Sequence, residues 1–356
     1  MNTDLEQLQQ YPFERLATLF TGLEPPKSLK NIPLSIGEPK HPPPEFVAHA
    51  IAASMDKISV YPNTKGALEL RQAIEVWLKD RFKLNCVDPE SQVLPVNGTR
   101  EALFSFAQAT IDRSDNPTIL MPNPFYQIYE GASILSGASI YFLNCDKETE
   151  YLTDFTSVPE KIWRSCQLIY ICSPGNPSGA VLSTSKMQEL IKLADKYDFI
   201  IASDECYSEI YYDEERPPPG LLEACSKMHR YNFKRCVAFH SLSKRSNLPG
   251  LRSGFVAGDA DILEQFLRYR TYHGCAMPLT TQIASIAAWS DEKHVQENRR
   301  KYRQKFDDFQ EILGGILPLD IPDGGFYLWM NISSTQLGND EIFCKNLFLQ
   351  QNVTVL

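Results

Sequence analysis

Short apolar runs alternate with stretches of helical spacing through the middle of the chain, between residues 92 and 258. Apolar runs that are this continuous indicate strands buried on both faces, and parallel strands need helical crossovers between them. The alternation therefore predicts an α/β fold, a mainly parallel sheet sandwiched by helices. The predicted strands are 92–96, 118–121, 139–143, 168–172, 199–202, 237–239 and 255–257, and the predicted helices between them are 99–109, 126–135 and 185–197.

Helical patterns dominate the C-terminal third, where a long charged helix from about 291 to 313 would lead to a smaller α+β domain with a strand at 325–329. The helix that opens at Ser185 has Gln188 in capping-box spacing. The chain ends within an apolar pattern typical of the middle of a strand, so we expect a further C-terminal segment. The expected parts are an N-terminal arm with a piece of the small domain (1–44), a large domain (45–290) and the C-terminal small domain (291–356).

The overall charge restricts the function classes. The 356-residue chain has a formal net charge of -9, whereas proteins that bind nucleic acids or membrane surfaces usually carry a basic face. Nine cysteines occur without any CxxC pair, which argues against a zinc site or a disulfide framework and favours reduced thiols. The polar N-terminus lacks the apolar core of a signal peptide. We therefore expect a cytoplasmic protein with no metal, nucleic-acid or membrane partner.

Polar residues follow several of the predicted strands, at the sheet edge where doubly wound folds bind ligands. Gly98 begins a strand-to-helix turn in which the amides of Thr99 and Arg100 could hold a phosphate. The alternative is an ordinary helix cap. Asp204 follows a later strand and could pair with a protonated pyridine nitrogen, with Tyr207 three residues further on. The alternative for Asp204 is again a helix cap.

Four further candidates lie at the ends of other predicted strands. Tyr126 could stack on a pyridine ring, although core packing is the commoner fate of a tyrosine. Asn176 lies in a rigid turn that could present its amide to a ring oxygen, or could be a plain surface turn. Lys244 lies among small hydroxyl residues, where desolvation would make its amine a nucleophile for pyridoxal phosphate (PLP). Arg252 offers a fork for the phosphate. The alternative for Lys244 and Arg252 is a basic surface loop. Because suitable residues recur in order at one predicted strand end after another, the individual alternatives become implausible when all are taken together.

The whole chain resembles the class I and II aminotransferases of PLP fold type I. The resemblance is carried by Asn97-Gly98-Thr99, Asn176-Pro177-x-Gly179, Asp204-x-x-Tyr207, Ser241-x-x-Lys244 and Arg252. The runs YPFERL, LSIGEP, NPFYQIYEGA, SDECYSEIY and HSLSKRSNLPGLRSGFVAGD are similar to one branch, the bacterial N-succinyldiaminopimelate aminotransferases of lysine biosynthesis. The resemblance implies a PLP-dependent homodimer that moves an amino group between glutamate and N-succinyl-2-amino-6-oxopimelate.

The resemblance also implies a role for each matched residue. Lys244 would bind PLP covalently and later carry the proton, and Asp204 would pair with the ring nitrogen. The other implied contacts are Asn176 and Tyr207 at the phenolate oxygen, Tyr126 on the ring, Thr99, Arg100, Ser241 and Arg252 at the phosphate, Tyr61 from the second subunit, and Ile36, Gly37 and Asn176 at the substrate. Arg270 is a candidate for a distal carboxylate. Relatives also carry a C-terminal arginine that binds the substrate α-carboxylate, and no such motif occurs up to Leu356.

Two alternatives remain open at this point. The first is a different PLP reaction on the same fold, either an aminotransferase of other specificity or a carbon–sulfur β-lyase. The second is a PLP-binding regulator without turnover, which a fold alone does not exclude.

Overall fold

The core of the protein is a mainly parallel sheet. The computed structural model describes residues 1–316, 320–333, 335 and 337–356. In this part of the chain seven strands form one sheet in the order β2-β8-β7-β6-β5-β3-β4. β3 to β7 pair in parallel, whereas β8 runs antiparallel to both β7 and β2. The strands are β2 (Val93–Val96), β3 (Thr118–Asn123), β4 (Ser139–Asn144), β5 (Cys166–Cys172), β6 (Ile200–Asp204), β7 (Cys236–Ser241) and β8 (Gly254–Gly258). The predicted α/β class is confirmed.

Helices cover both faces of this sheet, because successive residues of a strand point to opposite sides. In β5, Leu168 and Tyr170 pack in one hydrophobic core, and Ile169 and Ile171 pack in the other. One core is completed by α4 (Thr99–Thr110), α5 (Gln127–Ser136) and α10 (Ala260–His273). The other is completed by α3 (Leu68–Phe82), α6 (Glu160–Ser165), α7 (Thr184–Tyr197), α8 (Leu221–Lys227) and α11 (Leu279–Trp289), and α2 (Glu45–Ala53) also packs there. The buried strands explain the long apolar runs of the sequence.

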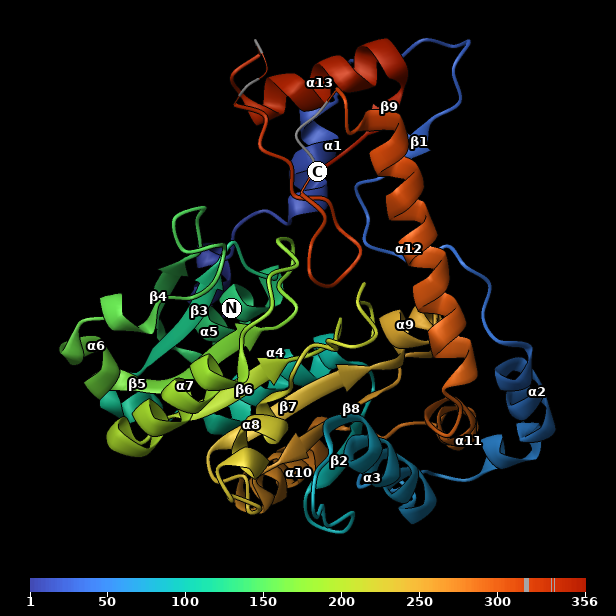
Figure 1. Cartoon of the computed structure of the whole chain (residues 1–356). Helices are drawn as coiled ribbons and strands as arrows, with labels where there is room; N and C mark the ends of the chain where they lie inside the picture. The colour runs from blue at the N-terminus through green and yellow to red at the C-terminus, as the bar shows by residue number, and fades with distance from the viewer. Residues whose placement is uncertain (317–319, 334, 336) are drawn as a thin grey trace.

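The two ends of the chain come together away from this sheet. β1 (Ile32–Pro33) pairs in parallel with β9 (Val353–Thr354), and α1 (Pro12–Leu19) leads to Phe20, which stacks on Phe348 of α13 (Asp340–Gln351) at 4.5 Å between ring centroids. The long helix α12 (Lys293–Leu313) runs from α9 (Leu242–Arg245) and α11 towards this group of elements (Figure 1). The arrangement agrees with a small domain built from both termini, while its exact boundaries stay a prediction.

Two local predictions are wrong. Residues 325–329 form no strand, although their aromatic composition favours one. Gly324 instead bonds to Gly179 and Gly325 to Ile210, so the segment follows loops of the sheet domain rather than a neighbouring strand. The cap of α7 is Ser183, whose Oγ accepts from the Lys186 amide at 3.3 Å, and not Ser185. The run of three hydroxyl residues from Ser183 leaves the helix start ambiguous by sequence alone.

Two general findings concern cysteines and hydropathy. All nine cysteines are free thiols. Among the described residues, no helix combines the length with the apolar character that a bilayer crossing requires.

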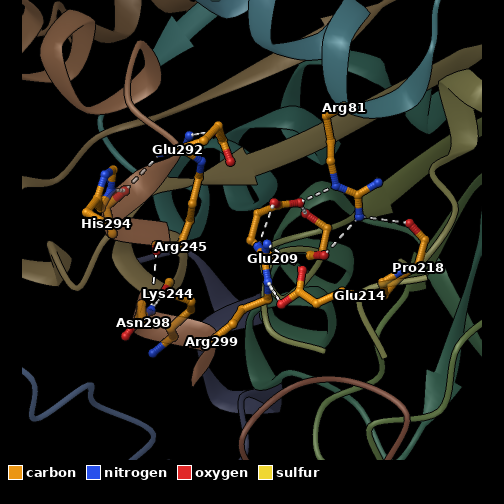
Figure 2. A network of polar contacts seen from close by, with 12 residues as sticks. Arg81, Glu209, Glu214, Pro218, Lys244, Arg245, Glu292, His294, Asn298 and Arg299 are labelled. Atoms are coloured by element: carbon orange, nitrogen blue, oxygen red, sulfur yellow. Dashed lines mark hydrogen bonds and ion pairs between the residues drawn. The ribbon is translucent and has the colours of Figure 1, made fainter. Parts of the chain in front are cut away.

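Buried ion pairs fix α12 to the sheet domain. Glu209 accepts from Nε of Arg81 at 2.7 Å and lies 3.6 Å from Nη1 of Arg299, and Arg299 also pairs with Glu214 at 2.9 Å (Figure 2). Burial alone would raise the pKa of the Glu209 carboxyl, but the guanidinium groups around it hold that pKa below its usual value. Glu209 is therefore ionised, and its charge is balanced by Arg81 from α3 and Arg299 from α12.

Replacing Glu209 by Gln should destabilise the protein by about 3 kcal/mol, because it leaves buried guanidinium groups without their counter-charge. Urea unfolding measures this loss. Glu297→Gln on the exposed side of α12 is the control and should leave the unfolding free energy nearly unchanged. The lowered pKa of Glu209 means that its contribution is complete above the unfolded pKa and is lost as the pH falls through the folded pKa. A loss equal to that of the control would contradict this assignment.

Candidate active site

Lys244 lies at the carboxyl end of β7, on the four-residue helix α9. Ser241 caps this helix, since its Oγ accepts from the Ser243 amide at 3.1 Å. The Lys244 Nζ donates to the backbone carbonyl of Gly37 and lies 5.1 Å from the centre of the Phe326 ring. Burial lowers the pKa of the Lys244 amine to about 8. A larger share of this amine than of an ordinary lysine is therefore neutral, and hence nucleophilic, near neutral pH.

A buried acid lies at the end of the adjacent strand β6. Asp204 accepts a hydrogen bond from the Tyr129 hydroxyl at 2.7 Å and one from the Cys206 amide at 3.2 Å. Burial raises the pKa of the Asp204 carboxyl, and among the described residues it forms no ion pair. A protonated ring nitrogen placed beside it would supply the missing positive charge and favour the ionised carboxylate.

The N-terminus of α4 and the Arg252 side chain form an anion cradle. Gly98 precedes this helix with φ of +83°, and a Cβ built on it would lie 2.4 Å from Nη2 of Arg252. The guanidinium thus lies directly against the Gly98 backbone, beside the free amides of the first helical turn. The Thr99 hydroxyl faces the Cys206 thiol at 2.9 Å. A phosphate held here would meet both helix amides and a charged fork.

Aromatic side chains enclose the space between these groups. The Tyr207 hydroxyl bonds to the Tyr327 hydroxyl at 2.8 Å, and both rings are close to Phe326. The Tyr126 ring packs edge-on against Tyr129 at 5.8 Å between centroids, and burial raises the pKa of its hydroxyl. Of these rings, Tyr207 and Phe326 lie against the half-buried Lys244 amine, at 6.0 and 5.1 Å from their centres, and shield it in part from water.

The structure also places the remaining predicted residues. Asn176 lies in a tight turn after β5, closed by the bond from the Gly179 amide to the Gly175 carbonyl. Ile36 is exposed, while its neighbour Gly37 touches the lysine. The Arg100 side chain donates to the Tyr11 hydroxyl at 3.2 Å, so a phosphate would meet its backbone amide more readily than its guanidinium.

Two predicted residues lie apart from this group. Tyr61 is fully exposed in the single chain. Arg270 is completely buried, bonds to both Glu101 oxygens at 2.7 and 3.0 Å and donates to the Cys275 carbonyl. Its guanidinium is thus already occupied, and this geometry gives no support to a substrate carboxylate at Arg270.

Some residues of the site received no role from the sequence. Tyr129, the hydroxyl partner of Asp204, follows Tyr126 by three positions, and helical spacing alone does not rank two such tyrosines. Tyr327 lies in the segment wrongly predicted as a strand. A Cβ on Gly37 would lie 1.9 Å from the Tyr327 hydroxyl, so these two residues are in direct contact across a long stretch of sequence.

One group of possible metal ligands occurs among the described residues. Glu101, His273 and Cys275 each offer a ligand atom, all within 4.8 Å of one another. The Arg270 guanidinium already neutralises the Glu101 carboxylate, so a cation would compete with a buried arginine. The prediction that no metal is bound stays a prediction.

The arrangement fits PLP. Its aldehyde would meet a desolvated lysine, its ring nitrogen a buried carboxylate, and its phosphate a helix N-terminus with an arginine. Lys244, Asp204 and the start of α4 lie at or just after the carboxyl ends of β7, β6 and β2, where parallel sheets bind ligands. Arg252 precedes β8, and because β8 runs antiparallel to β7, its amino end lies at the same edge of the sheet.

Comparison with known proteins gives one consistent family. The family model for "Aminotransferase class I and II" matches residues 30–356. An aminotransferase structure from Neisseria meningitidis is 48% identical, with a TM-score of 0.94, over 99% of this chain and 89% of that one. The structure of aminotransferase AspB from Helicobacter pylori is 37% identical, with a TM-score of 0.89, over 97% and 88%. LL-diaminopimelate aminotransferase from Dehalococcoides mccartyi is 30% identical over 91% of this chain and 82% of that protein.

The lowered pKa of Lys244 predicts how the protein takes up PLP. Only the neutral amine attacks an aldehyde, so the rate of PLP attachment to cofactor-free protein should rise through about pH 8 and then level off. An ordinary lysine would keep gaining rate to about pH 10.4. Stopped-flow absorbance measures this profile, and Lys244→Ala should abolish the visible band. A rate that still rises steeply at pH 10 would contradict the assignment.

Proposed function

Because the chain belongs to the class I and II aminotransferases, a PLP-dependent family, we propose that it transfers an amino group between glutamate and an oxo acid of the diaminopimelate type. The specific proposal is the pair N-succinyl-LL-2,6-diaminopimelate and N-succinyl-2-amino-6-oxopimelate, in lysine biosynthesis. The observation that carries the transfer chemistry is the buried, partly neutral Lys244 amine at the end of β7, one strand away from the buried Asp204.

The residues of the chain have separable tasks in this reaction. Bound PLP supplies the sink for the electrons of the substrate Cα–H bond. Lys244 would hold the cofactor covalently, and after a substrate amine has displaced it, its free Nζ would take up the substrate α-proton and deliver it to the cofactor carbon. Asp204, whose carboxylate is oriented by the Tyr129 hydroxyl, would place a negative charge opposite the ring nitrogen. Tyr207 and Asn176 would donate to the ring oxygen, and Arg252 with the α4 amides would hold the phosphate.

The loop at Ile36 and Gly37 gives the substrate site one wall. The Gly37 carbonyl accepts a hydrogen bond from the Lys244 amine. The backbone of residues 36 and 37 would therefore lie close to a substrate bound at this lysine. Aromatic rings of Tyr207, Phe326 and Tyr327 exclude water there. Exclusion of water strengthens the interaction of the site with charged groups of the substrate.

The succinyl group is the finer part of the proposal. It rests on the sequence runs shared with the N-succinyldiaminopimelate aminotransferases, above all the run after Lys244. Unsuccinylated LL-diaminopimelate is the competing substrate, because the relative from Dehalococcoides mccartyi is by name an LL-diaminopimelate aminotransferase. LL-diaminopimelate has two free amines, whereas in the succinylated compound one amine is acylated and carries an additional carboxylate. An assay with each compound alone therefore distinguishes the two substrates.

A substrate panel tests the proposal. Purified enzyme with PLP and 2-oxoglutarate is given N-succinyl-LL-diaminopimelate, LL-diaminopimelate, other amino acids and cystathionine, and glutamate formation is measured. We expect the highest kcat/KM with the succinylated compound. A higher value with LL-diaminopimelate would move the substrate assignment to that compound. Cystathionine cleavage without glutamate formation would contradict amino transfer.

We also propose that the enzyme is a cytoplasmic homodimer with shared active sites. Four exposed apolar residues lie close together between positions 55 and 61: Met55, Ile58, Val60 and Tyr61, which are 50, 71, 57 and 100% accessible. Such a stretch is typical of a surface that another molecule covers. A cavity of about 730 Å³ opens in front of Arg100 and Arg252, at the phosphate end of the site. A partner's Tyr61 entering this cavity would reach the phosphate.

Mixing two inactive variants tests the shared site. Lys244→Ala removes the lysine but keeps Tyr61, and Tyr61→Ala keeps the lysine but gives its partner no tyrosine. In a mixed dimer, the site with Lys244 receives Tyr61 from the other subunit, so activity should rise to about a quarter of the wild-type value, since one of two sites in half of the dimers is complete. This estimate follows from random pairing in a symmetric dimer. Mixtures no more active than Tyr61→Ala alone would contradict the shared site.

A further inference from the structure

Asn298 of α12 holds the turn that carries the lysine. Its side chain is buried, and Nδ2 donates to the backbone carbonyls of Lys244 at 3.2 Å and of Arg245 at 3.3 Å (Figure 2). These are the last carbonyls of α9, and carbonyls at the end of a helix have no partner within the helix. The orientation of Lys244 therefore depends on a side chain from a different element.

The same side chain also holds the loop next to Gly37. Asn298 Oδ1 accepts from Nδ2 of Asn247 at 2.9 Å and lies 2.8 Å from Nδ1 of His41. Because an amide oxygen only accepts, Nδ1 of His41 carries the proton and donates. His41 follows Gly37 by four residues and is itself half-buried against α12. One amide group thus bridges the lysine turn and the loop whose carbonyl bonds to Lys244.

The next turn of α12 completes the connection. Tyr302 follows Asn298 by four residues and therefore lies on the same face of α12. Its ring centre lies 4.8 Å from that of His41 and 5.4 Å from that of Phe326, on which it stacks. Phe326 in turn lies over the Lys244 amine. Side chains of α12 therefore contact all three segments around the lysine amine: the turn that carries Lys244, the loop after Gly37, and the segment of Phe326.

We propose that Asn298 is a positioning residue that couples the Gly37 loop to the Lys244 amine, so that a substrate carboxylate at the loop sets the lysine in place for proton transfer. The inference rests on the proposed function. Asn298 does not touch the reacting atoms, and it acts through the Lys244 carbonyl on one side and through His41 on the other.

Three variants separate the two sides of this connection. Asn298→Asp keeps the acceptor for His41 and Asn247 but loses both donors to the lysine turn. His41→Phe keeps a ring against Tyr302 but loses the bond to Asn298. Asn298→Ala removes both sides. Glu297→Gln, its exposed neighbour on α12, is the matched control. Leu190→Ala, a buried position on α7, is the control for a general loss of stability without a change near Lys244.

The measurements are kcat, KM for the amino donor, and the pH midpoint of the visible absorbance of the enzyme-bound cofactor. Asn298→Asp should lower kcat about 10- to 100-fold and shift the midpoint, because misplacing a reacting group by about 1 Å costs about 100-fold in rate. His41→Phe should raise KM with an unchanged midpoint. Asn298→Ala should show both effects. Both controls should keep the wild-type midpoint.

A cofactor-free readout accompanies these kinetics. Hydrogen exchange of the protein without PLP should speed up in residues 36–41 and 242–247 of Asn298→Ala together, and in neither segment of Leu190→Ala. Folded Asn298 variants with wild-type kcat, KM and midpoint would overturn the inference, as would equal shifts in Leu190→Ala. A wild-type protein that shows no visible cofactor band would instead refute the proposed function, so the two failures are distinguishable.

Discussion

The buried guanidinium of Arg245 is the contact on which the site depends. It lies between the rings of Trp77 and Trp289, at 5.5 and 4.7 Å from their centres, and donates to the Ala288 carbonyl at the end of α11. Burial lowers the pKa of this group, and Glu292 and the helix end supply compensating negative charge. Because Arg245 follows Lys244 directly, its anchor fixes α9 against α11 and α12. The anchored Arg245 therefore fixes the backbone of Lys244, and the contacts with the Gly37 carbonyl and the Phe326 ring then orient the amine.

The network behind Arg245 gives α12 two functions. Its first turns bind the sheet domain through Glu292 and through Arg299 with Glu209, and its later turns lead to the elements formed by both chain ends (Figure 1). A rigid helix that joins both regions makes the position of one depend on the other. Asn298 lies where this helix passes Lys244, so it is well placed to pass a change at the Gly37 loop on to the lysine.

Much of the site could be predicted from the sequence because parallel sheets bind ligands at one edge. Buried strands read clearly as apolar runs, so Asp204 and Lys244 could be placed at strand ends without knowing the register. Contacts between distant segments could not be found in this way. Tyr129, Tyr327 and Asn298 reach the site through tertiary packing, which no local pattern encodes.

The errors have physical causes of the same kind. The aromatic segment at 325–329 has the composition of a strand, but its backbone bonds to loops near Gly179 and Ile210 and its rings fill the site. Tertiary contacts outweigh β-propensity there. The Arg270 prediction rested on the family resemblance alone, which does not reveal that Glu101 and the Cys275 carbonyl already bind this buried guanidinium. In both cases the partner lies far away in sequence.

The central claim is that Lys244 is the covalent anchor of the cofactor. Reduction of the PLP-loaded protein with borohydride makes that bond permanent, and peptide mass spectrometry then locates the pyridoxyl group. The structure predicts a single labelled peptide in which Lys244 carries the label, since its desolvated amine follows β7, the strand next to the one that ends at Asp204. A label on another lysine, or no label on a protein that binds PLP, would contradict the account.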